Sequence, residues 1–548
     1  MNLQQPNAND CTRTANRSKN VVPSSGICSR CIDGCRGNCE IFKSTFRGRE
    51  LIYPGPFSEI TAGGDKNYPV DYSHFNIHGY AFGGKGLPGD EIANSDNALF
   101  PLVNTNTEYG WDKKVKMNLP IFTGALGSTE IARKNWEHFA IGAAISGVTI
   151  VCGENVCGID PGLELNKDNK VTLSPEMDRR IEVYKRYHTG MGELLIQMNV
   201  EDTRNGVAEY IIGKYGNDVI LELKWGQGAK DIGGEIQVAS LEYALFLQNR
   251  GYVVDPDPSK PAVQEAFKNG ALKSFARHSR LGYTELSNYD EVRADFMKSV
   301  DYLRGLGYKR ISLKTGSYGM EALAASIKLA TDAQLDLLTI DGSGGGTGMS
   351  PWNMMETWGV PSLLLHAKAH EYASILAAKG YKVVDMAFAG GLAREDHMFK
   401  ALALGAPFTK LVCMGRGVMI PAFVGANIEG ALHPERREAL SGNWETLPKN
   451  VLEHGTKADE IFAGYYDMQN KIGADAMKKI PYGAIAVWTL ADKLAGGLQQ
   501  FMAGARKFSL NQIARTDISS ANRETEMETG IPFITDFQDE FAKKILNS

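Results

Sequence analysis

The sequence predicts an α/β fold: a (β/α)8 TIM barrel with an N-terminal cysteine-rich module and a helical C-terminal extension. Two observations favour this class. From about residue 117 to 425, short β-branched runs alternate with amphipathic helical stretches, the pattern of a parallel sheet covered by helices. Three of these runs also end in glycine-rich loops, and the loops after the last strands of such barrels commonly hold a phosphate. The three exits are Gly342-Ser-Gly-Gly-Gly-Thr-Gly348, Gly390-Gly391 and Gly415-Arg-Gly417.

Eight runs are candidate strands, and eight is the number that closes a barrel. They lie near residues 119–124, 147–152, 193–198, 218–224, 309–315, 335–341, 383–389 and 408–414. The interval from 225 to 308 is too long for a single helical crossover, so we expect an insertion between the fourth and fifth strands.

The rest of the chain is added to this barrel at both ends. Residues 1–60 form a cysteine-rich metal module, and residues 61–116 form an extended lead-in that we expect to pack on the barrel. The barrel takes residues 117–430, and residues 431–548 form a largely helical extension.

Composition narrows the class of protein. The 548 residues are 43% hydrophobic and 22% charged, with a net charge of −5, so there is no electrostatic reason to expect nucleic acid as a partner. No apolar run reaches the roughly 18 residues that span a bilayer, and the N-terminus lacks the basic head and apolar core of a secretion signal. We therefore expect a cytoplasmic protein without a membrane partner.

Four cysteines near the N-terminus predict a metal centre. Cys28, Cys31, Cys35 and Cys39 follow the pattern C-x2-C-x3-C-x3-C, and thiolates this close together can wrap one centre. A reducing cytosol disfavours disulfides. The compact spacing favours a [4Fe–4S] iron–sulfur cluster. The alternative is a four-cysteine zinc site, although zinc usually binds two C-x2-C pairs separated by a longer loop.

The loops after the predicted strands resemble those of glutamate synthases. Gly124-Ala-Leu-Gly-Ser128 is similar to that family's G-A-M-S-F-G loop, and Cys152-Gly-Glu-Asn155 to its T-G-E-G segment. The stretch 222–235 resembles K-M-A-Q-G-A-K-P-G-E-G-G-Q, and the stretch 341–351 resembles G-H-D-G-G-T-G-A-S-P. The matches run in the right order from about 117 to 425, and the resemblance implies an FMN-binding (β/α)8 barrel.

Several positions have a role of their own in such a site. Lys314 ends the fifth strand, where a cation would stabilise negative charge on the N1–C2=O edge of a reduced flavin; alternatively it is a lysine extending to solvent from a strand end. A glycine-rich set would cradle the phosphate and approach the cofactor closely, with plain tight turns as the alternative. The cofactor-binding set is Gly124, Ala125, Gln227, Lys314, Gly345, Gly346, Gly390, Gly391, Gly415 and Arg416.

Other positions match those that face the flavin or the keto acid in glutamate synthases. Lys224 and Lys230 would supply the positive charge that a carboxylate substrate needs, and Glu154 would relay protons to an imine. Glu235 stands where the family has a glutamine near the keto acid, and its carboxylate would repel a dicarboxylate. The predicted catalytic set is therefore Glu154, Lys224, Lys230 and Glu235, although Lys230 with Asp231 is also explained as a surface pair.

The chain also departs from the family. No cysteine lies between 414 and 432, where glutamate synthases bind a [3Fe–4S] cluster, and Asn2 stands where a glutaminase would present a cysteine. We expect an FMN-dependent oxidoreductase acting on an amino or keto acid, the family default being glutamate formation from 2-oxoglutarate and ammonia. Electrons would pass through the N-terminal cluster to or from a one-electron carrier such as ferredoxin or a reductase subunit, in a homo-oligomer or larger complex. The alternatives are a non-redox amine/glutamate transferase subunit and a non-catalytic flavin or metal sensor.

Overall fold

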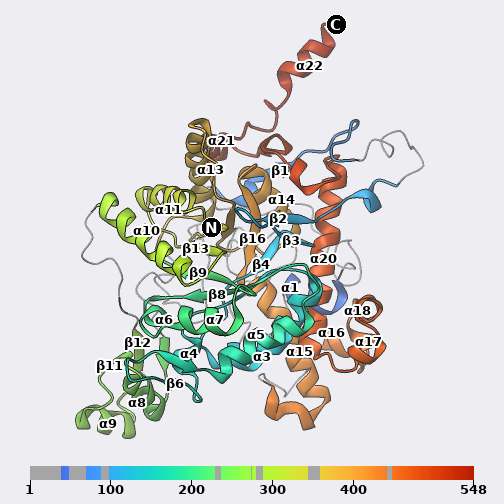
Figure 1. The fold of residues 1–548 in the computed structure, drawn as a ribbon. Helices are drawn as coiled ribbons and strands as arrows, with labels where there is room; N and C mark the ends of the chain where they lie inside the picture. The colour runs from blue at the N-terminus through green and yellow to red at the C-terminus, as the bar shows by residue number, and fades with distance from the viewer. Residues whose placement is uncertain are drawn as a thin grey trace.

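The computed structural model describes residues 39–48, 70–87, 98–226, 228, 236–272, 275–278, 280, 288–343, 358–440, 447 and 449–548. At its centre lies a parallel eight-stranded sheet (Figure 1). Its strand order is β4-β16-β15-β14-β13-β9-β8-β5. The predicted TIM barrel is confirmed, and each of the eight candidate strands is present. Their bounds are β4 Ile121–Thr123, β5 Ile150–Cys152, β8 Leu194–Met198, β9 Ile220–Lys224, β13 Ile311–Thr315, β14 Leu337–Asp341, β15 Met386–Ala389 and β16 Thr409–Met414.

The first two barrel strands, β4 and β5, close the sheet into a barrel. The backbone N–H of Thr123 donates to the carbonyl of Thr149 at 3.1 Å. Beyond the strand end, the N–H of Leu126 donates to Val151 at 3.1 Å, and the N–H of Gly153 donates back to Leu126 at 2.8 Å. The hydrogen bonding therefore continues past the strands and joins the two loops that follow them.

Helices cover the outside of the barrel, one after each strand. Three of them begin at a capping residue: the side chains of Thr129, Ser174 and Asn288 each accept a backbone N–H from the first turn of the helix that follows. The covering helices are α3 Glu130–Ser146, α5 Pro175–Tyr187, α7 Val207–Tyr215, α10 Tyr289–Gly305, α11 Met320–Asp332, α13 Ser362–Ala378, α14 Glu395–Leu404 and α15 Gly415–Leu432. Shorter elements lie between them: α4 Val156–Ile159, β6 Glu164–Leu165, β7 Val171–Leu173 and α6 Val200–Arg204.

The expected insertion between β9 and β13 forms a small subdomain. Its three-stranded antiparallel sheet has the order β10-β12-β11, with bounds Ile236–Val238, Phe275–His278 and Val253–Asp255. The helices α8 Leu241–Asn249 and α9 Pro261–Lys268 complete it, and Figure 1 shows these elements gathered on one side of the barrel. Its core is separate from the main one and includes Tyr252 and Phe275, together with Ile159 from the barrel side.

The lead-in contains short strands, because its extended segments pair with other parts of the chain. The strand β1 Phe75–Ile77 pairs antiparallel with β17 Ile518–Ser520 near the C-terminus. The strands β2 Thr107–Tyr109 and β3 Val115–Met117 form an antiparallel pair just before the barrel begins. Short 3-10 helices lie at Tyr72–His74, Phe100–Leu102, Pro434–Ala439, Leu510–Gln512 and Arg515–Asp517.

The C-terminal extension is mainly helical and is built into the barrel wall. Its longest helix, α20 Tyr482–Gly504, packs against both α3 and α15, and the helix α1 Glu40–Arg47 packs against α20 and α15 in turn. The remaining helices are α16 Lys449–Leu452, α17 Ala458–Ile461, α18 Tyr465–Ile472, α19 Ala474–Met477, α21 Arg523–Thr529 and α22 Asp539–Leu546. Among the helices of the described part, none combines the length and apolar character that crossing a bilayer requires.

Candidate active site at the carboxyl end of the barrel

Charged side chains meet at the carboxyl ends of β5 and β9. Lys224 is the last residue of β9, and Glu154 follows β5 by two residues. The Lys224 ammonium lies 2.6 Å from Oε1 of Glu154, and both side chains are largely buried. The structure thus joins two predicted catalytic residues in one ion pair at the end of the barrel where active sites of this fold lie.

The predicted flavin-contacting lysine is next to this pair. In the register of β9 and β13, Lys314 lies beside Lys224, and its ammonium is 3.1 Å from Oδ2 of Asp341 at the end of β14. Burial acts to lower the pKa of Lys314, but Asp341, Cys413 and Glu222 outweigh burial and hold the pKa above its usual value. Lys314 is therefore a buried, permanently charged cation rather than a lysine extending into solvent.

Below Lys314 lies a buried carboxyl group that the sequence reasoning did not single out. Glu222 is 1% exposed, and its Oε1 accepts a hydrogen bond of 2.6 Å from the side-chain amide of Gln197. Burial raises the pKa of Glu222, although Lys314 and the bond from Gln197 act in the opposite direction. The sequence feature that could have identified Glu222 is its position between two leucines in a buried parallel strand, where a charged residue is unusual.

The glycine-rich exits lie against one another at the same end of the barrel. A Cβ added to Gly124 would be 2.7 Å from Cα of Gly415, at the start of α15. Met414, at the N-cap of α15, makes no side-chain hydrogen bond to the first turn, so that turn's amides are not capped by it. Gly390 and Gly391 follow β15 with φ of +118° and +97°. Gly124, Gly390, Gly391 and Gly415 therefore lie at this end of the barrel, and the phosphate site expected there stays a prediction.

Replacing Gly390 with alanine is expected to destabilise the protein by more than about 2 kcal/mol. The new Cβ would be 2.0 Å from Oγ of Ser362 and 2.6 Å from the carbonyl oxygen of Gly342, in addition to the strain of the positive φ. Gly380→Ala is the matched control, because Gly380 has φ +85° and no atom within 4 Å of its added Cβ. Thermal unfolding of both variants measures the difference, and equal losses would contradict a close-packed role for Gly390.

The insertion subdomain brings an arginine to this end of the barrel. Arg277 on β12 is 2% exposed; its Nη2 donates to Oγ of Ser128 at 3.2 Å, and its guanidinium lies over the ring of Tyr252, 5.0 Å from the centroid. The hydroxyl of Tyr252 donates to Oδ1 of Asn155 at 3.1 Å. The subdomain is thus anchored on the loops that carry Ser128 and Glu154, and it places a cation there that the sequence reasoning missed.

A buried carboxyl group also supports the loop that carries Glu154. Oδ2 of Asp202 accepts the backbone N–H of Asn155 at 2.9 Å and that of Asn199 at 3.3 Å. Burial raises the pKa of Asp202 to about 7, against the lowering effect of these two hydrogen bonds. Asp202 therefore changes charge near neutral pH, directly behind a predicted catalytic residue.

The raised pKa of Asp202 predicts a pH dependence of stability. Since the folded protein binds this proton up to about pH 7 and an unfolded aspartate releases it near 3.8, the stabilisation is complete below about pH 4 and is lost as the pH rises through about 7. Asp202→Asn keeps an uncharged acceptor for Asn155, so its thermal midpoint should vary less between pH 5 and pH 8 than that of the wild type. A wild-type dependence that survives in the variant would contradict this assignment.

Some predicted residues lie outside the described part of the chain. They are Gln227, Lys230, Glu235, Gly345, Gly346, Cys28, Cys31 and Cys35, together with the side chain of Arg416. Of the four-cysteine motif the structure places Cys39, which is buried at the N-cap of α1, and its sulfur accepts the N–H of Phe42 at 3.4 Å. The metal assignment therefore stays a prediction.

Comparison with known proteins supports the relationship suggested by the loops. Residues 287–423 match the conserved region in glutamate synthase. The archaeal-type glutamate synthase (NADPH) of Dehalococcoides mccartyi is 29% identical over 230 residues, which make up 40% of this chain and 40% of that protein. The glutamate synthase large subunit-like protein YerD of Bacillus subtilis is 31% identical over 203 residues, 36% of this chain and 33% of that protein. The match thus covers less than half of either relative.

Two solved structures align with most of this chain, but at low identity and low TM-score. An (S)-mandelate dehydrogenase mutant has a TM-score of 0.39 and 13% identity, covering 82% of this chain and 88% of that one. The flavin-binding domain of baker's yeast flavocytochrome b2 has a TM-score of 0.42 and 11% identity, covering 86% of this chain and 81% of that one. The predicted similarity of this chain to glutamate synthases is confirmed by the sequence matches alone, and the matched region 287–423 contains Lys314, Asp341 and the glycines after β15 and β16.

Proposed function

We propose that this chain is an FMN-dependent oxidoreductase of the glutamate synthase type that acts on an amino or keto acid. The observation that carries the proposal is the buried cation of Lys314, next to the Lys224–Glu154 ion pair at the carboxyl end of the barrel. The similarity to glutamate synthases over residues 287–423, which contain Lys314, supports the same class.

The residues at the site fit FMN. The first turn of α15 and the turn at Gly390 and Gly391 offer backbone amides to a phosphate, and the contact between Gly124 and Gly415 leaves no room for a side chain at Gly124. Lys314 would face the edge of the flavin ring that gains negative charge on reduction. Its own positive charge is stabilised by Asp341 and Glu222. When bound there, FMN supplies the hydride-transfer chemistry.

The side chains around Glu154 suit a carboxylate substrate. The guanidinium of Arg277 uses one Nη to reach Ser128, and its Nε has no hydrogen-bond partner among the described residues. A guanidinium that still has N–H donors available binds a carboxylate in a fixed orientation. Lys224 would hold a second anionic group, and Oε1 of Glu154 would exchange a proton with the substrate nitrogen. These roles favour an amino or keto acid.

The N-terminal cysteines would serve electron transfer. Cys39 occupies the N-cap of α1 and its sulfur accepts the backbone N–H of Phe42, so the last cysteine of the motif is fixed at the start of a helix. We therefore include in the proposal a [4Fe–4S] cluster at Cys28, Cys31, Cys35 and Cys39, which would exchange single electrons with an external carrier such as ferredoxin.

The test is anaerobic purification followed by metal and flavin analysis, and then titration of the flavin spectrum. We expect the amino acid substrate to bleach the oxidised flavin, and the corresponding keto acid with ammonia to restore the colour of the reduced form; glutamate and 2-oxoglutarate, the family default, are the first pair to test. In the second direction, the keto acid and ammonia take up two electrons and two protons and release water. A chain that purifies colourless and does not bind added FMN would overturn the proposal.

A further inference from the structure

We propose that Arg180 is a positioning residue for the loops after β4 and β5, holding them in the arrangement that FMN and the reacting acid require. The inference rests on the proposed function and assigns to it a residue of the helix α5, behind the site. Arg180 is fully buried, although it lies in the run Asp178-Arg-Arg180 of a covering helix. A buried guanidinium needs a reason, because taking its charge out of water costs several kcal/mol.

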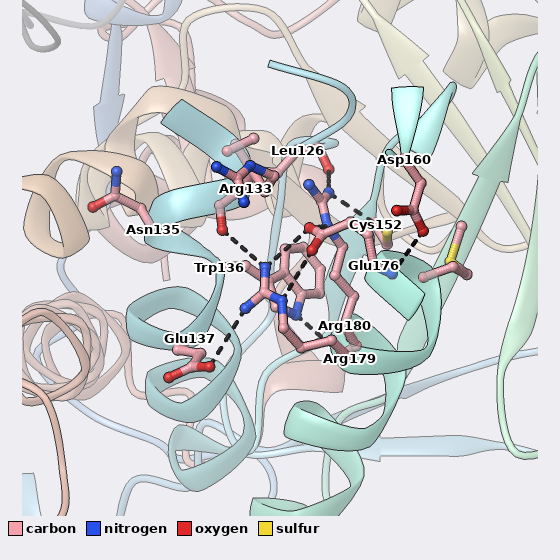
Figure 2. Close-up of polar contacts among 12 residues, drawn as sticks. Leu126, Arg133, Asn135, Trp136, Glu137, Cys152, Asp160, Glu176, Arg179 and Arg180 are labelled. Atoms are coloured by element: carbon pink, nitrogen blue, oxygen red, sulfur yellow. Dashed lines mark hydrogen bonds and ion pairs between the residues drawn. The ribbon is translucent and has the colours of Figure 1, made fainter. Parts of the chain in front are cut away.

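The contacts of Arg180 point to both loops (Figure 2). Its Nη1 donates to the carbonyl of Leu126 and to the carbonyl of Gly127, each at 3.0 Å, and lies 3.9 Å from the sulfur of Cys152. Leu126 and Gly127 belong to the loop after β4, and Cys152 is the last residue of β5. One guanidinium therefore contacts the two neighbouring strand exits from below.

The two loops are also joined to each other at this point. The carbonyl of Leu126 accepts from Nη1 of Arg180 and from the backbone N–H of Gly153. A Cβ added to Gly153 would be 2.6 Å from the amide nitrogen of Gly127, so the two backbones are in contact. Ala125 precedes this junction, and Glu154 follows it. By holding the two loops, Arg180 thus helps to fix Ala125, a predicted flavin contact, and Glu154, the proposed proton-exchanging carboxylate.

Arg180 is itself held rigidly. Its Nε donates to Oε1 of Glu176 at 2.7 Å, its guanidinium lies over the ring of Trp136 at 5.1 Å from the centroid, and its own carbonyl accepts the indole N–H of Trp136 at 3.0 Å. The backbone N–H of Glu176 in turn donates a hydrogen bond to Oδ2 of Asp160 at 2.8 Å. Because its guanidinium and its backbone carbonyl are both held, Arg180 can in turn hold the loops that it contacts.

Stability alone does not account for this arrangement. Replacing a buried ion pair with apolar side chains of similar volume is often neutral or stabilising. What the guanidinium adds is direction, since its planar donors can satisfy two neighbouring carbonyls together. This directionality suits a residue that positions a loop. The loop after β4 contains Gly124, which contacts the first turn of α15 at Gly415.

The neighbouring arginine provides a matched control. Arg179 donates to the same carboxylate, from Nε to Oε2 and from Nη2 to Oε1 of Glu176, at 2.9 Å each (Figure 2). Its other contacts are the carbonyl of Arg133 and the carboxylate of Glu137, both on α3. Arg179 thus shares the helix and the acidic partner of Arg180, but its contacts are with α3 instead of the loops.

The test uses the full-length chain stripped of flavin, as wild type, Arg180→Met, Arg180→Lys and Arg179→Met. Fluorescence titration with FMN gives the dissociation constant, and visible circular dichroism at saturating FMN reports the surroundings of the bound ring, which a mere loss of global stability would not change. We expect Arg180→Met to weaken FMN binding at least tenfold and to alter the dichroism spectrum. Arg180→Lys should lie between it and the wild type, and Arg179→Met should bind FMN within twofold of wild type with an unchanged spectrum.

Two results would overturn the inference alone: Arg180→Met with wild-type affinity and spectrum, or Arg179→Met with the same defect as Arg180→Met. Should Arg180→Met fail to fold, Arg180→Lys decides, because wild-type affinity and spectrum in that variant would contradict a need for two directed donors. A wild-type chain that does not bind FMN would overturn the proposed function as well, so the two failures are distinguishable.

Discussion

Replacing Lys314 with methionine is expected to lower the free energy of unfolding by about 3–5 kcal/mol at neutral pH, because it leaves buried carboxyl groups without their cation. Asp341 lies 3.1 Å from the Lys314 ammonium, and Glu222 is within its electrostatic influence. The loss should shrink at acidic pH, because burial raises the pKa of Glu222, and a protonated Glu222 no longer needs a counter-charge. Urea unfolding at pH 5 and pH 7.5 measures both effects.

A second substitution separates charge balance from packing. In the double variant Lys314→Met with Asp341→Asn, the nearest negative charge is removed, and we expect at least half of the lost stability to return. FMN binding should stay weakened in the double variant, since the cation facing the flavin is still missing. Stability that does not recover would show that Lys314 acts through its volume instead of its charge.

Replacing Arg277 with methionine is expected to raise KM for the carboxylate substrate about 30- to 100-fold, with a smaller fall in kcat. A hydrogen bond to a charged group contributes about 1.5–3 kcal/mol, a range that includes the expected change, and the buried position of Arg277 leaves little water to substitute for it. The ring of Tyr252, over which the guanidinium lies, can pack against methionine, so the subdomain should keep its fold. Steady-state kinetics with the identified acid gives the two constants.

The control for Arg277 lies three residues further along. Arg280 is on the same segment, but its guanidinium pairs with Glu201 at 2.8 Å and donates to the carbonyl of Gly251 at 2.8 Å. Arg280→Gln removes a positive charge from the subdomain without changing the group that faces Ser128. An equal rise of KM in both variants would indicate a general electrostatic effect and would contradict a specific carboxylate contact at Arg277.

The barrel was predictable because its signal is local. A strand buried on both faces is a short run of branched and apolar residues, and the eight runs in the sequence match the eight strands. The pairing of the lead-in strands was not predictable in this way. The strand β1 pairs with β17, more than 440 positions later, and runs of three residues carry no period of their own.

The candidate site was predictable where its residues lie at or just beyond the ends of strands. Lys224 is the last residue of β9, Lys314 is the next to last of β13, and Glu154 follows β5 by two residues, so the parallel sheet brings them to one edge. Arg277 and Ser128 are 149 positions apart, and their contact depends on how the inserted subdomain folds back. Arg180 was hidden for another reason: an arginine in a charged helical run is typical of a solvated face, and its burial is a property of the tertiary structure.

The helix α20 has a consequence for how the chain is made. It packs on α3 and α15, the helices that follow the first and the last barrel strands, and it lies 50 or more positions beyond the end of α15. During synthesis on the ribosome, the apolar surfaces of α3 and α15 therefore remain uncovered after every barrel strand has emerged. The seam between the two ends of the barrel is covered only after α20 has left the ribosome, so a nascent chain that stalls before Tyr482 leaves an apolar surface exposed to the chaperones of the cell.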